Sequence, residues 1–232
     1  MKALFIASEV RSGSTYAAEA IAYSFAESFG VECWGLAHEK FAVLNGDCQP
    51  AKVRAILNEL FINQAGFRCS KLMVKDLTVI FRAIDEDETI AEDFLSSSCA
   101  WIIVRKKNKF RQAVSLSYAE ASGVYHNYTA EDSAPDYNIS ISPQDVKRRY
   151  LALAASDDYL SLFSTKARRS VTIFHEDFVE DPLSTIKHII SSLNLPFDSQ
   201  AVEYSTPKIT PTAQTGKRQL EKDFREYFLR NF

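Results

Sequence analysis

The sequence predicts an α/β fold in which helices flank a mainly parallel central sheet. Two observations carry this prediction: four short apolar runs have the character of strands buried on both faces, and helical periodicity or helix signals follow three of them. The chain has 232 residues, of which 46% are hydrophobic. This length suits one compact domain with a sizeable core and is short for two, so we expect residues 1–232 to form a single domain.

The predicted strands are 3–7, 71–74, 100–104 and 171–174. Each is a short run of mainly apolar residues, as in strands covered by helices on both sides. In open parallel sheets, ligands bind beyond the carboxyl ends of the strands. We therefore expect the functional residues to lie in the segments that follow these strands.

The predicted helices are 17–29, 108–122 and 182–193. Apolar residues recur at helical spacing in the first two, and Gly30 and Gly123 are the expected stops. Pro182 stands in the first turn of the third helix, where its missing N–H costs nothing.

Composition excludes several classes of protein. The formal net charge of -3 argues against a general nucleic-acid binder, so any basic site must be local. The four cysteines are far apart, with no CxxC pair and no nearby histidine pair. This spacing predicts buried thiols and no zinc or redox motif.

Targeting signals are also missing from the sequence. The first apolar run is about five residues long and leads into a charged loop. No segment approaches the ~20 apolar residues of a membrane span. With reduced cysteines, these features predict a cytoplasmic protein without integral membrane contact.

The segment between the first strand and its helix carries the most information. Arg11, Ser12, Gly13, Ser14 and Thr15 combine one glycine, three hydroxyls and a guanidinium where a strand meets a helix N-terminus. Free backbone N–H groups and the helix dipole favour a phosphate or sulfate there. The alternative is that a serine only caps the helix and Arg11 is a solvated charge.

This loop lacks the signatures of two common nucleotide-binding folds. A GxxxxGK[ST] loop needs a Gly-Lys pair, whose lysine reaches the terminal phosphates while the hydroxyl holds magnesium. A dinucleotide loop needs GxGxxG. The segment has one glycine and no Gly-Lys pair.

The order of strand, Arg-Ser-Gly-Ser-Thr and helix resembles the 5'-phosphosulfate loop of sulfotransferases, specifically the bacterial trehalose 2-sulfotransferase type. Further segments resemble that family in the same order along the chain. They are 39–41 (Glu-Lys-Phe), 71–73 (Lys-Leu-Met), 112–115 (Gln-Ala-Val-Ser) and 175–178 (His-Glu-Asp-Phe) with the following Asp-Pro at 181–182.

The resemblance implies a P-loop-like sulfotransferase fold and an enzyme that moves a sulfonate from 3'-phosphoadenosine 5'-phosphosulfate (PAPS) to a hydroxyl. PAPS would be the co-substrate, no metal would be needed, and 3'-phosphoadenosine 5'-phosphate (PAP) would leave. Relatives act on glycolipids, oligosaccharides or polysaccharides and can dimerise. The family's acceptor segments are not closely reproduced here, so we expect a carbohydrate or glycolipid acceptor without naming the sugar.

The resemblance also assigns the donor-binding residues. The loop from Arg11 to Thr15 would hold the 5'-phosphosulfate, with Arg11 supplying charge-assisted hydrogen bonds and stabilising the leaving phosphate. Ser115 would hold the 3'-phosphate together with a cation. Arg105 ends the strand, but the common spacing of eight residues before the serine falls on Lys107, so Arg105, Lys106 and Lys107 remain alternatives.

Glu39 is the predicted base for the acceptor hydroxyl, since it matches the glutamate that the family presents near the acceptor. It follows a strand-like run at 31–36. His38 is the alternative base, because the pKa of histidine suits proton pickup. Lys71 is predicted to face the sulfonate or the acceptor.

Two segments are predicted to cover the site. Residues 126–143 are polar, contain two prolines and predict a loop or lid. Residues 208–232 would close over the nucleotide: a flexible basic stretch carrying Lys217 and Arg218 precedes a last helix. These two cations either contact the 3'-phosphate or belong to an exposed loop. The apolar side of the last helix is formed by Leu220, Phe224, Tyr227 and Phe228.

Two rival hypotheses come from other classes. A kinase on a similar sheet predicts a Gly-Lys loop and magnesium dependence. A non-catalytic protein that binds PAP, PAPS or sulfated sugars predicts tight nucleotide binding without turnover.

Overall fold

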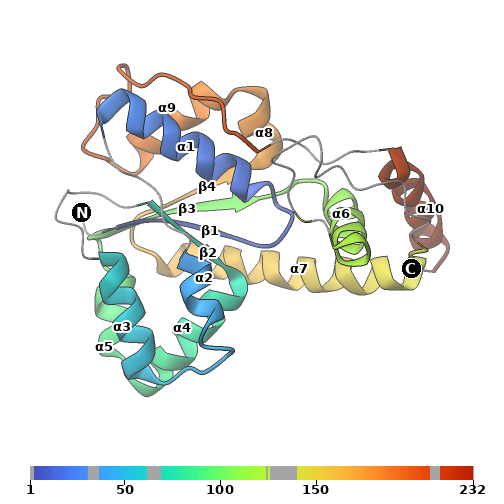
Figure 1. The fold of residues 1–232 in the computed structure, drawn as a ribbon, viewed down its shortest axis with the longest axis horizontal. Helices are drawn as coiled ribbons and strands as arrows, with labels where there is room; N and C mark the ends of the chain where they lie inside the picture. The colour runs from blue at the N-terminus through green and yellow to red at the C-terminus, as the bar shows by residue number, and fades with distance from the viewer. Residues whose placement is uncertain are drawn as a thin grey trace.

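In the described part of the chain, a sheet of four parallel strands forms the centre. The computed structural model describes residues 3–30, 37–61, 69–123, 125, 140–209 and 215–231. In these residues the sheet has the order β2-β1-β3-β4, with β1 (Ala3–Ser8), β2 (Cys69–Met73), β3 (Cys99–Arg105) and β4 (Ser170–Phe174). All three strand pairs are parallel. The carboxyl ends of the strands therefore share one edge, on the right in Figure 1.

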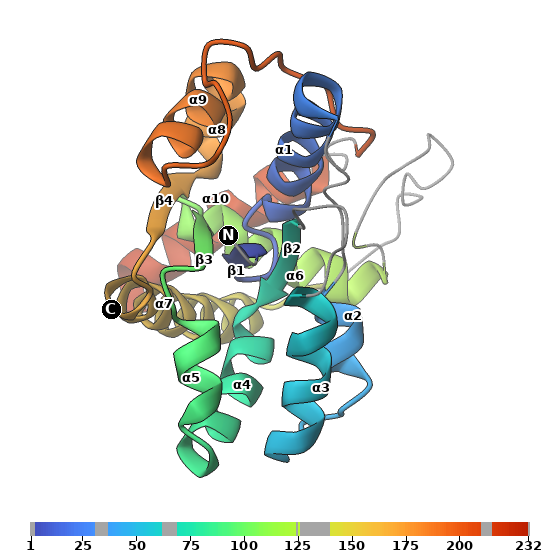
Figure 2. The ribbon, with the colours of Figure 1, turned by 90° about the vertical axis from the view of Figure 1, so that its left-hand side faces the viewer.

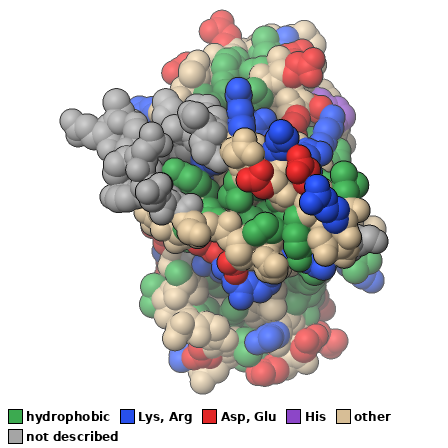
Figure 3. Space-filling model, turned by 90° about the vertical axis from the view of Figure 1, so that its right-hand side faces the viewer, with side chains coloured by type: hydrophobic (Ala, Val, Ile, Leu, Met, Phe, Trp, Pro, Cys, Tyr) green, Lys and Arg blue, Asp and Glu red, His purple; other side chains and the backbone are tan. Residues whose placement is uncertain are grey.

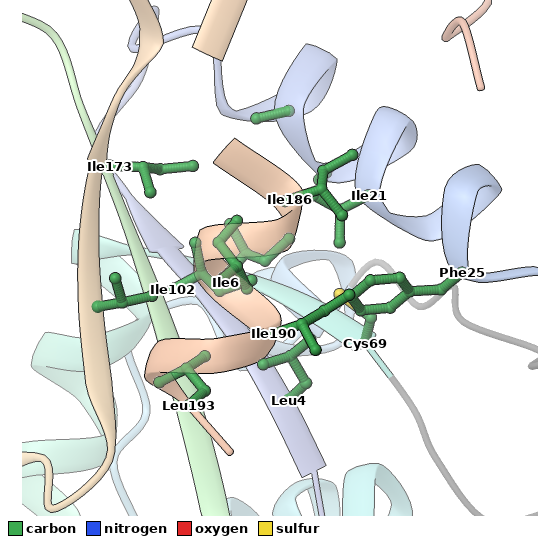
Figure 4. Packing of buried hydrophobic residues seen from close by; sticks show 14 of the residues in the cluster. Leu4, Ile6, Ile21, Phe25, Cys69, Ile102, Ile173, Ile186, Ile190 and Leu193 are labelled. Carbon is green, nitrogen blue, oxygen red and sulfur yellow. The ribbon is translucent and has the colours of Figure 1, made fainter. Parts of the chain in front are cut away.

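One face of the sheet, the α1 face, is covered by α1 (Ser14–Phe29), α8 (His175–Glu180) and α9 (Pro182–Ser192). Aliphatic side chains of the strands alternate toward these helices. Figure 4 shows the packing of the labelled residues Leu4, Ile6, Ile21, Phe25, Cys69, Ile102, Ile173, Ile186, Ile190 and Leu193. This face fixes the start of α1, and with it the loop that follows β1.

The opposite face is covered by α2 (Ala37–Ala42), α3 (Pro50–Phe61), α4 (Val74–Glu86), α5 (Thr89–Phe94) and the second half of α7 (Pro143–Lys166). Figure 2 shows the sheet between these two layers. Aromatic rings fill this side: Phe5 and Trp101 stack with centroids 4.6 Å apart, and Phe94 meets Trp101 edge-on. Both faces of the sheet are thus buried, as the near-continuous apolar strands require.

A third apolar cluster lies beside the carboxyl ends of the strands. It joins α6 (Lys109–Ser122), the first half of α7 and α10 (Thr215–Asn231). Phe224 of α10 is fully buried there and contacts Phe110 of α6 and Tyr150 of α7. This cluster fixes α6 and α10 next to the edge of the sheet where ligands bind in such folds.

The predicted α/β architecture and its four strands are confirmed. The strand predicted at 71–74 differs in extent: it starts at Cys69, and Val74 is already the first residue of α4. The predicted helix stops at Gly30 and Gly123 are correct, whereas α1 already starts at Ser14 and α9 ends at Ser192, one residue before the predicted end. Gly30 and Gly123 both end helices in the left-handed conformation, and Asp181 caps the helix that opens with Pro182.

Other predictions fall partly outside the described residues. The strand-like run 31–36 and residues 126–139 of the predicted lid are not described, and 143 begins the long helix α7. Lys217 and Arg218 lie inside the first turns of α10, where a flexible stretch was expected, because the apolar side of α10 packs on α6 and α7. In the described part of the chain, we find no helix with the length and apolarity that a membrane crossing needs.

Candidate functional site

The loop between β1 and α1 turns back through two left-handed residues. Arg11 has φ 56° and Gly13 has φ 83°. Gly13 is the N-cap of α1, and its carbonyl accepts from the N–H of Ala17. This path brings the N-terminus of α1 to the carboxyl end of the central strand, which is the geometry that binds anions.

Gly13 also permits a close approach by a side chain from the start of α8. A Cβ on Gly13 would overlap the imidazole ring of His175, the first residue of α8. Glycine is therefore needed here for two reasons, its backbone conformation and its missing side chain. His175, which the sequence did not assign to the site, packs directly against the loop.

Arg11 points from the loop toward α6. Its Nε donates to the hydroxyl of Ser115 at 3.1 Å, and a terminal nitrogen donates to the carbonyl of Tyr125. Burial lowers the pKa of Arg11, although a guanidinium stays protonated in proteins. The two predicted phosphate cradles, one around Arg11 and one around Ser115, thus meet at a direct hydrogen bond.

Two hydrogen-bonded residues hold these elements together. The buried amide of Gln112 on α6 donates to the carbonyl of Val10 at 2.7 Å. The carboxylate of Glu176 on α8 accepts from the backbone N–H groups of Lys107 and Asn108, at 3.0 and 3.2 Å. The loop, the β3–α6 turn and α8 therefore form one hydrogen-bonded framework.

Cations from the β3–α6 turn, α6 and α10 lie near Arg11 of the loop. Lys217 of α10 is buried, and its ammonium lies 5.1 Å from the centre of the Tyr118 ring. Burial lowers the pKa of Lys217 to about 8. Repulsion from Arg11, Lys106 and Arg111 adds to this shift. We call Arg11, Lys106, Arg111 and Lys217 the cation cluster.

The pKa of Lys106 is affected by the same arginines. Burial lowers its pKa to about 8, Glu176 opposes the shift, and Arg111 and Arg11 reinforce it. A partly buried group of mutually repelling cations costs folding free energy. An anion placed among them would relieve that cost and restore the full charge of both lysines.

Arg105 and Lys107, the two sequence neighbours of Lys106, form ion pairs with other helices. Arg105 pairs with Asp157 of α7, and Lys107 pairs with Asp177 of α8. Lys107 is about half exposed, at 52% of its side chain. Among the three candidate cations, burial, Arg111 and Arg11 lower the pKa of Lys106, whereas hydrogen bonds to Asp157 and Asp177 raise the pKa of Arg105 and Lys107.

The other predicted residues of the loop differ in how far they are buried. Ser12 and Ser14 are buried, and Thr15 is half-buried. The hydroxyl of Ser12 and Nδ1 of His175 are buried without a hydrogen-bond partner in the described part of the chain. Orphaned polar atoms beside a cationic centre are available to a ligand.

Two predicted residues are exposed. Glu39 lies on the short helix α2, which contacts β2, and the side chain of its neighbour His38 is outside the described residues. Arg218 follows Lys217 on α10 and faces solvent.

Lys71 is buried, and its Nζ donates to Thr15 Oγ1 at 2.7 Å. This contact joins the edge strand β2 to the first turn of α1. In the residues that the structure describes, no three His, Cys, Asp or Glu side chains gather as metal ligands.

Comparisons with known proteins give little beyond a distant likeness. No family model and no curated protein matches the chain. A crystal structure of retinol dehydratase in a complex with retinol and PAP aligns with a TM-score of 0.40 and 13% identity, covering 99% of this chain and 81% of that one. Retinol dehydratase in complex with androsterone and PAP gives a TM-score of 0.37 and 13% identity, covering 96% and 64%. The site itself must therefore support any proposal.

The contact between Gly13 and His175 predicts a specific stability loss. Gly13→Ala should lower the free energy of unfolding by about 1–3 kcal/mol more than Gly30→Ala, because overpacking adds to the left-handed backbone penalty. Gly30 is the matched control, since it has φ 64° and no atom within 4 Å of an added Cβ. Urea denaturation measures both variants, and a His175→Ala background should remove the difference. Equal costs in the wild-type background would contradict the contact.

Proposed function

We propose that this protein is a PAPS-dependent sulfotransferase. The observation that carries the proposal is the cation cluster, which lies beside an anion-binding loop at the carboxyl edge of a parallel sheet. A donor with two separated anionic groups suits this arrangement. PAPS has a 5'-phosphosulfate and a 3'-phosphate, whereas ATP carries its charge on a single chain.

In this proposal, the two anionic groups occupy adjacent positions. The 5'-phosphosulfate lies at the N-terminus of α1, where backbone N–H groups and the buried hydroxyl of Ser12 can donate to it. The 3'-phosphate lies between Ser115 and the lysines of the cation cluster. Arg11, which donates to Ser115, stands between both groups and can contact either.

Lys106 is the cation that we propose for the 3'-phosphate among the three consecutive candidates. Burial lowers its pKa, and the charges of Arg111 and Arg11 lower it further, so Lys106 shares their electrostatic environment. Arg105 and Lys107 are already engaged by Asp157 and Asp177. Lys217 is proposed to close the site from α10.

Transfer would occur by in-line displacement. The bond between sulfur and the bridging oxygen of the 5'-phosphate breaks, and its electron pair leaves with PAP. A new bond forms between sulfur and the acceptor oxygen, while the hydroxyl proton passes to a base. Because bonding in such transition states is loose, positioning and charge stabilisation at the leaving phosphate supply most of the catalysis.

The acceptor hydroxyl needs a base, and the candidates lie on α2. Glu39 is an exposed carboxylate on α2, beside the strand that carries Lys71, and we propose it as the base, with His38 as the alternative. A hydroxyl of a carbohydrate or glycolipid is the proposed acceptor. The single domain, the cytoplasmic location and dimer formation expected from the sequence belong to the same proposal.

Binding of PAP tests the donor site. Calorimetric titration in the presence of a chelator should show PAP binding that is far tighter than ATP binding. Lys106→Ala should weaken PAP binding about 10- to 100-fold, since it removes a charge-assisted hydrogen bond. Lys107→Ala, the matched control, should change the affinity less than about twofold because its ion pair is exposed.

Either of two results would contradict this assignment. No PAP binding, or a preference for ATP, would remove the sulfotransferase proposal. A loss in Lys107→Ala with none in Lys106→Ala would assign the 3'-phosphate to Lys107.

Substitution of Glu39 tests the base. Glu39→Gln should lower the turnover of PAPS with an accepted sugar by about 10²- to 10⁴-fold and leave PAP affinity unchanged, because the carboxylate acts on the acceptor proton alone. Glu59→Gln on the adjacent helix α3 makes the same charge change and should retain activity. An equal loss of turnover and PAP affinity in Glu39→Gln would instead indicate a structural role.

A further inference from the structure

A chain of hydrogen-bonded side chains leads from α7 to the loop between β1 and α1. Asp157 of α7 accepts from Lys109 Nζ at 2.6 Å, and Lys109 Nζ also donates to Gln112 Oε1 at 3.2 Å. Gln112 Nε2 in turn donates to the carbonyl of Val10 at 2.7 Å. We call Asp157, Lys109 and Gln112 the polar relay. It connects α7 with the peptide that precedes Arg11.

The three side chains of the polar relay are largely shielded from water. Gln112 is fully buried, and the side chains of Asp157 and Lys109 are 13% and 17% exposed. Asp157 also accepts from Arg105, the last residue of β3. Burial opposes ionisation of Asp157, but the hydrogen bonds from Arg105 and Lys109 outweigh burial and lower the pKa of the carboxyl group. Asp157 is therefore ionised at neutral pH and compensates the charges of both cations.

The polar relay selects one orientation of the Gln112 amide. An ionised carboxylate only accepts hydrogen bonds, and an ammonium only donates them. The ammonium of Lys109 therefore faces the amide oxygen, which leaves the amide NH2 group to face the carbonyl of Val10. Without Lys109, the amide could turn over and place its oxygen against that carbonyl. Two acceptors would then face each other, and the hydrogen bond to the loop would be lost.

The carbonyl that the polar relay holds lies at an unfavourable point of the backbone. The peptide from Val10 leads into Arg11, which has φ 56° although it is not a glycine. A residue with a side chain adopts this left-handed conformation only where neighbouring contacts favour it. The N–H of Val10 donates to Glu9 Oε1 at 2.7 Å, and its carbonyl accepts from Gln112. The hydrogen bond from Gln112 thus fixes the plane of the peptide from which Arg11 turns.

We propose that Asp157 and Lys109 are positioning residues for the loop that carries Arg11. Asp157 holds the ammonium of Lys109, and this ammonium selects the orientation of the Gln112 amide. The amide then holds the peptide from which the guanidinium of Arg11 reaches Ser115. The effect of the polar relay on donor affinity rests on the proposed function, whereas its effect on the loop does not.

The NMR resonance of the Arg11 amide nitrogen tests the effect on the loop. This nitrogen shares a peptide bond with the carbonyl of Val10, so its chemical shift changes when the carbonyl loses a hydrogen bond. In spectra of the protein without nucleotide, Lys109→Met and Asp157→Asn should move the resonance in the same direction as Gln112→Met, which removes the hydrogen bond itself. A resonance that stays in place in Lys109→Met and Asp157→Asn would overturn the proposal.

Two further observations make this test specific. Asp158→Asn is the matched control, because it makes the same charge change at an exposed neighbour on α7 and should leave the Arg11 resonance in place. The other observation needs no variant to fold. In the wild-type protein, the side-chain NH2 group of Gln112 should exchange slowly with water, since it is buried and bonded. Rapid exchange would overturn the proposal.

Calorimetric titration with PAP measures the consequence for the donor. Lys109→Met should weaken PAP binding about 3- to 10-fold, because the hydrogen bond that orders the loop is lost. In a Gln112→Met background, the same substitution should cause no further loss, since the amide through which Lys109 acts is absent. Losses that multiply in the double variant would indicate a merely structural role of Lys109 and would overturn the proposal.

The spectra without nucleotide separate this inference from the proposed function. Absence of PAP binding in the wild type, together with the expected shifts of the Arg11 resonance, would overturn the proposed function and leave the polar relay supported. Wild-type PAP binding, together with an Arg11 resonance that Lys109→Met and Asp157→Asn leave in place, would overturn the inference alone.

Discussion

The gathering of four cations beside the β1–α1 loop is the constraint on which the proposed donor site depends. Arg11, Lys106, Arg111 and Lys217 come from a loop, a turn and two helices. Burial is the main cause of the lowered pKa of both lysines, and the charges of Arg11 and Arg111 add to the shift. Such a group persists only if other forces hold the elements in place. The apolar cluster of α6, α7 and α10 does so, together with the hydrogen bonds of Gln112 and Glu176. Figure 3 views this side of the molecule, where Lys and Arg side chains gather with Asp and Glu between them.

The sequence predicted most of the parallel sheet because its strands are short apolar runs, and glycines mark the helix ends. The helix α7 was not predicted. Its buried residues belong to two different apolar clusters. Val146 and Leu153 pack in the cluster of α6 and α10, and Phe163 packs against the sheet on the face opposite to α1. Leu151 and Leu162 are exposed on the same helix. The apolar stripe is therefore interrupted, and periodicity alone does not identify it.

The position of a candidate residue could be predicted where a local sequence motif determines the backbone conformation. It could not be predicted where the direction of a side chain depends on contacts with residues distant in the sequence. The loop from Arg11 to Thr15 was predicted from a local pattern of glycine, hydroxyls and arginine, and Ser115 from the family resemblance of the segment 112–115. The choice among three consecutive cations depends on Asp157 and Asp177, which are distant in the sequence. The burial of Lys217 likewise depends on how α10 packs, and no local pattern encodes it.

In the proposed donor site, two separate anionic groups of one nucleotide are bound side by side. The most direct measurement compares the affinity of PAP with that of adenosine 5'-phosphate, which lacks the 3'-phosphate. We expect PAP to bind at least about 100-fold more tightly, since several charge-assisted hydrogen bonds depend on the 3'-phosphate. Lys217→Gln should reduce the ratio between the two affinities. Equal affinities for the two nucleotides would contradict the proposed donor site.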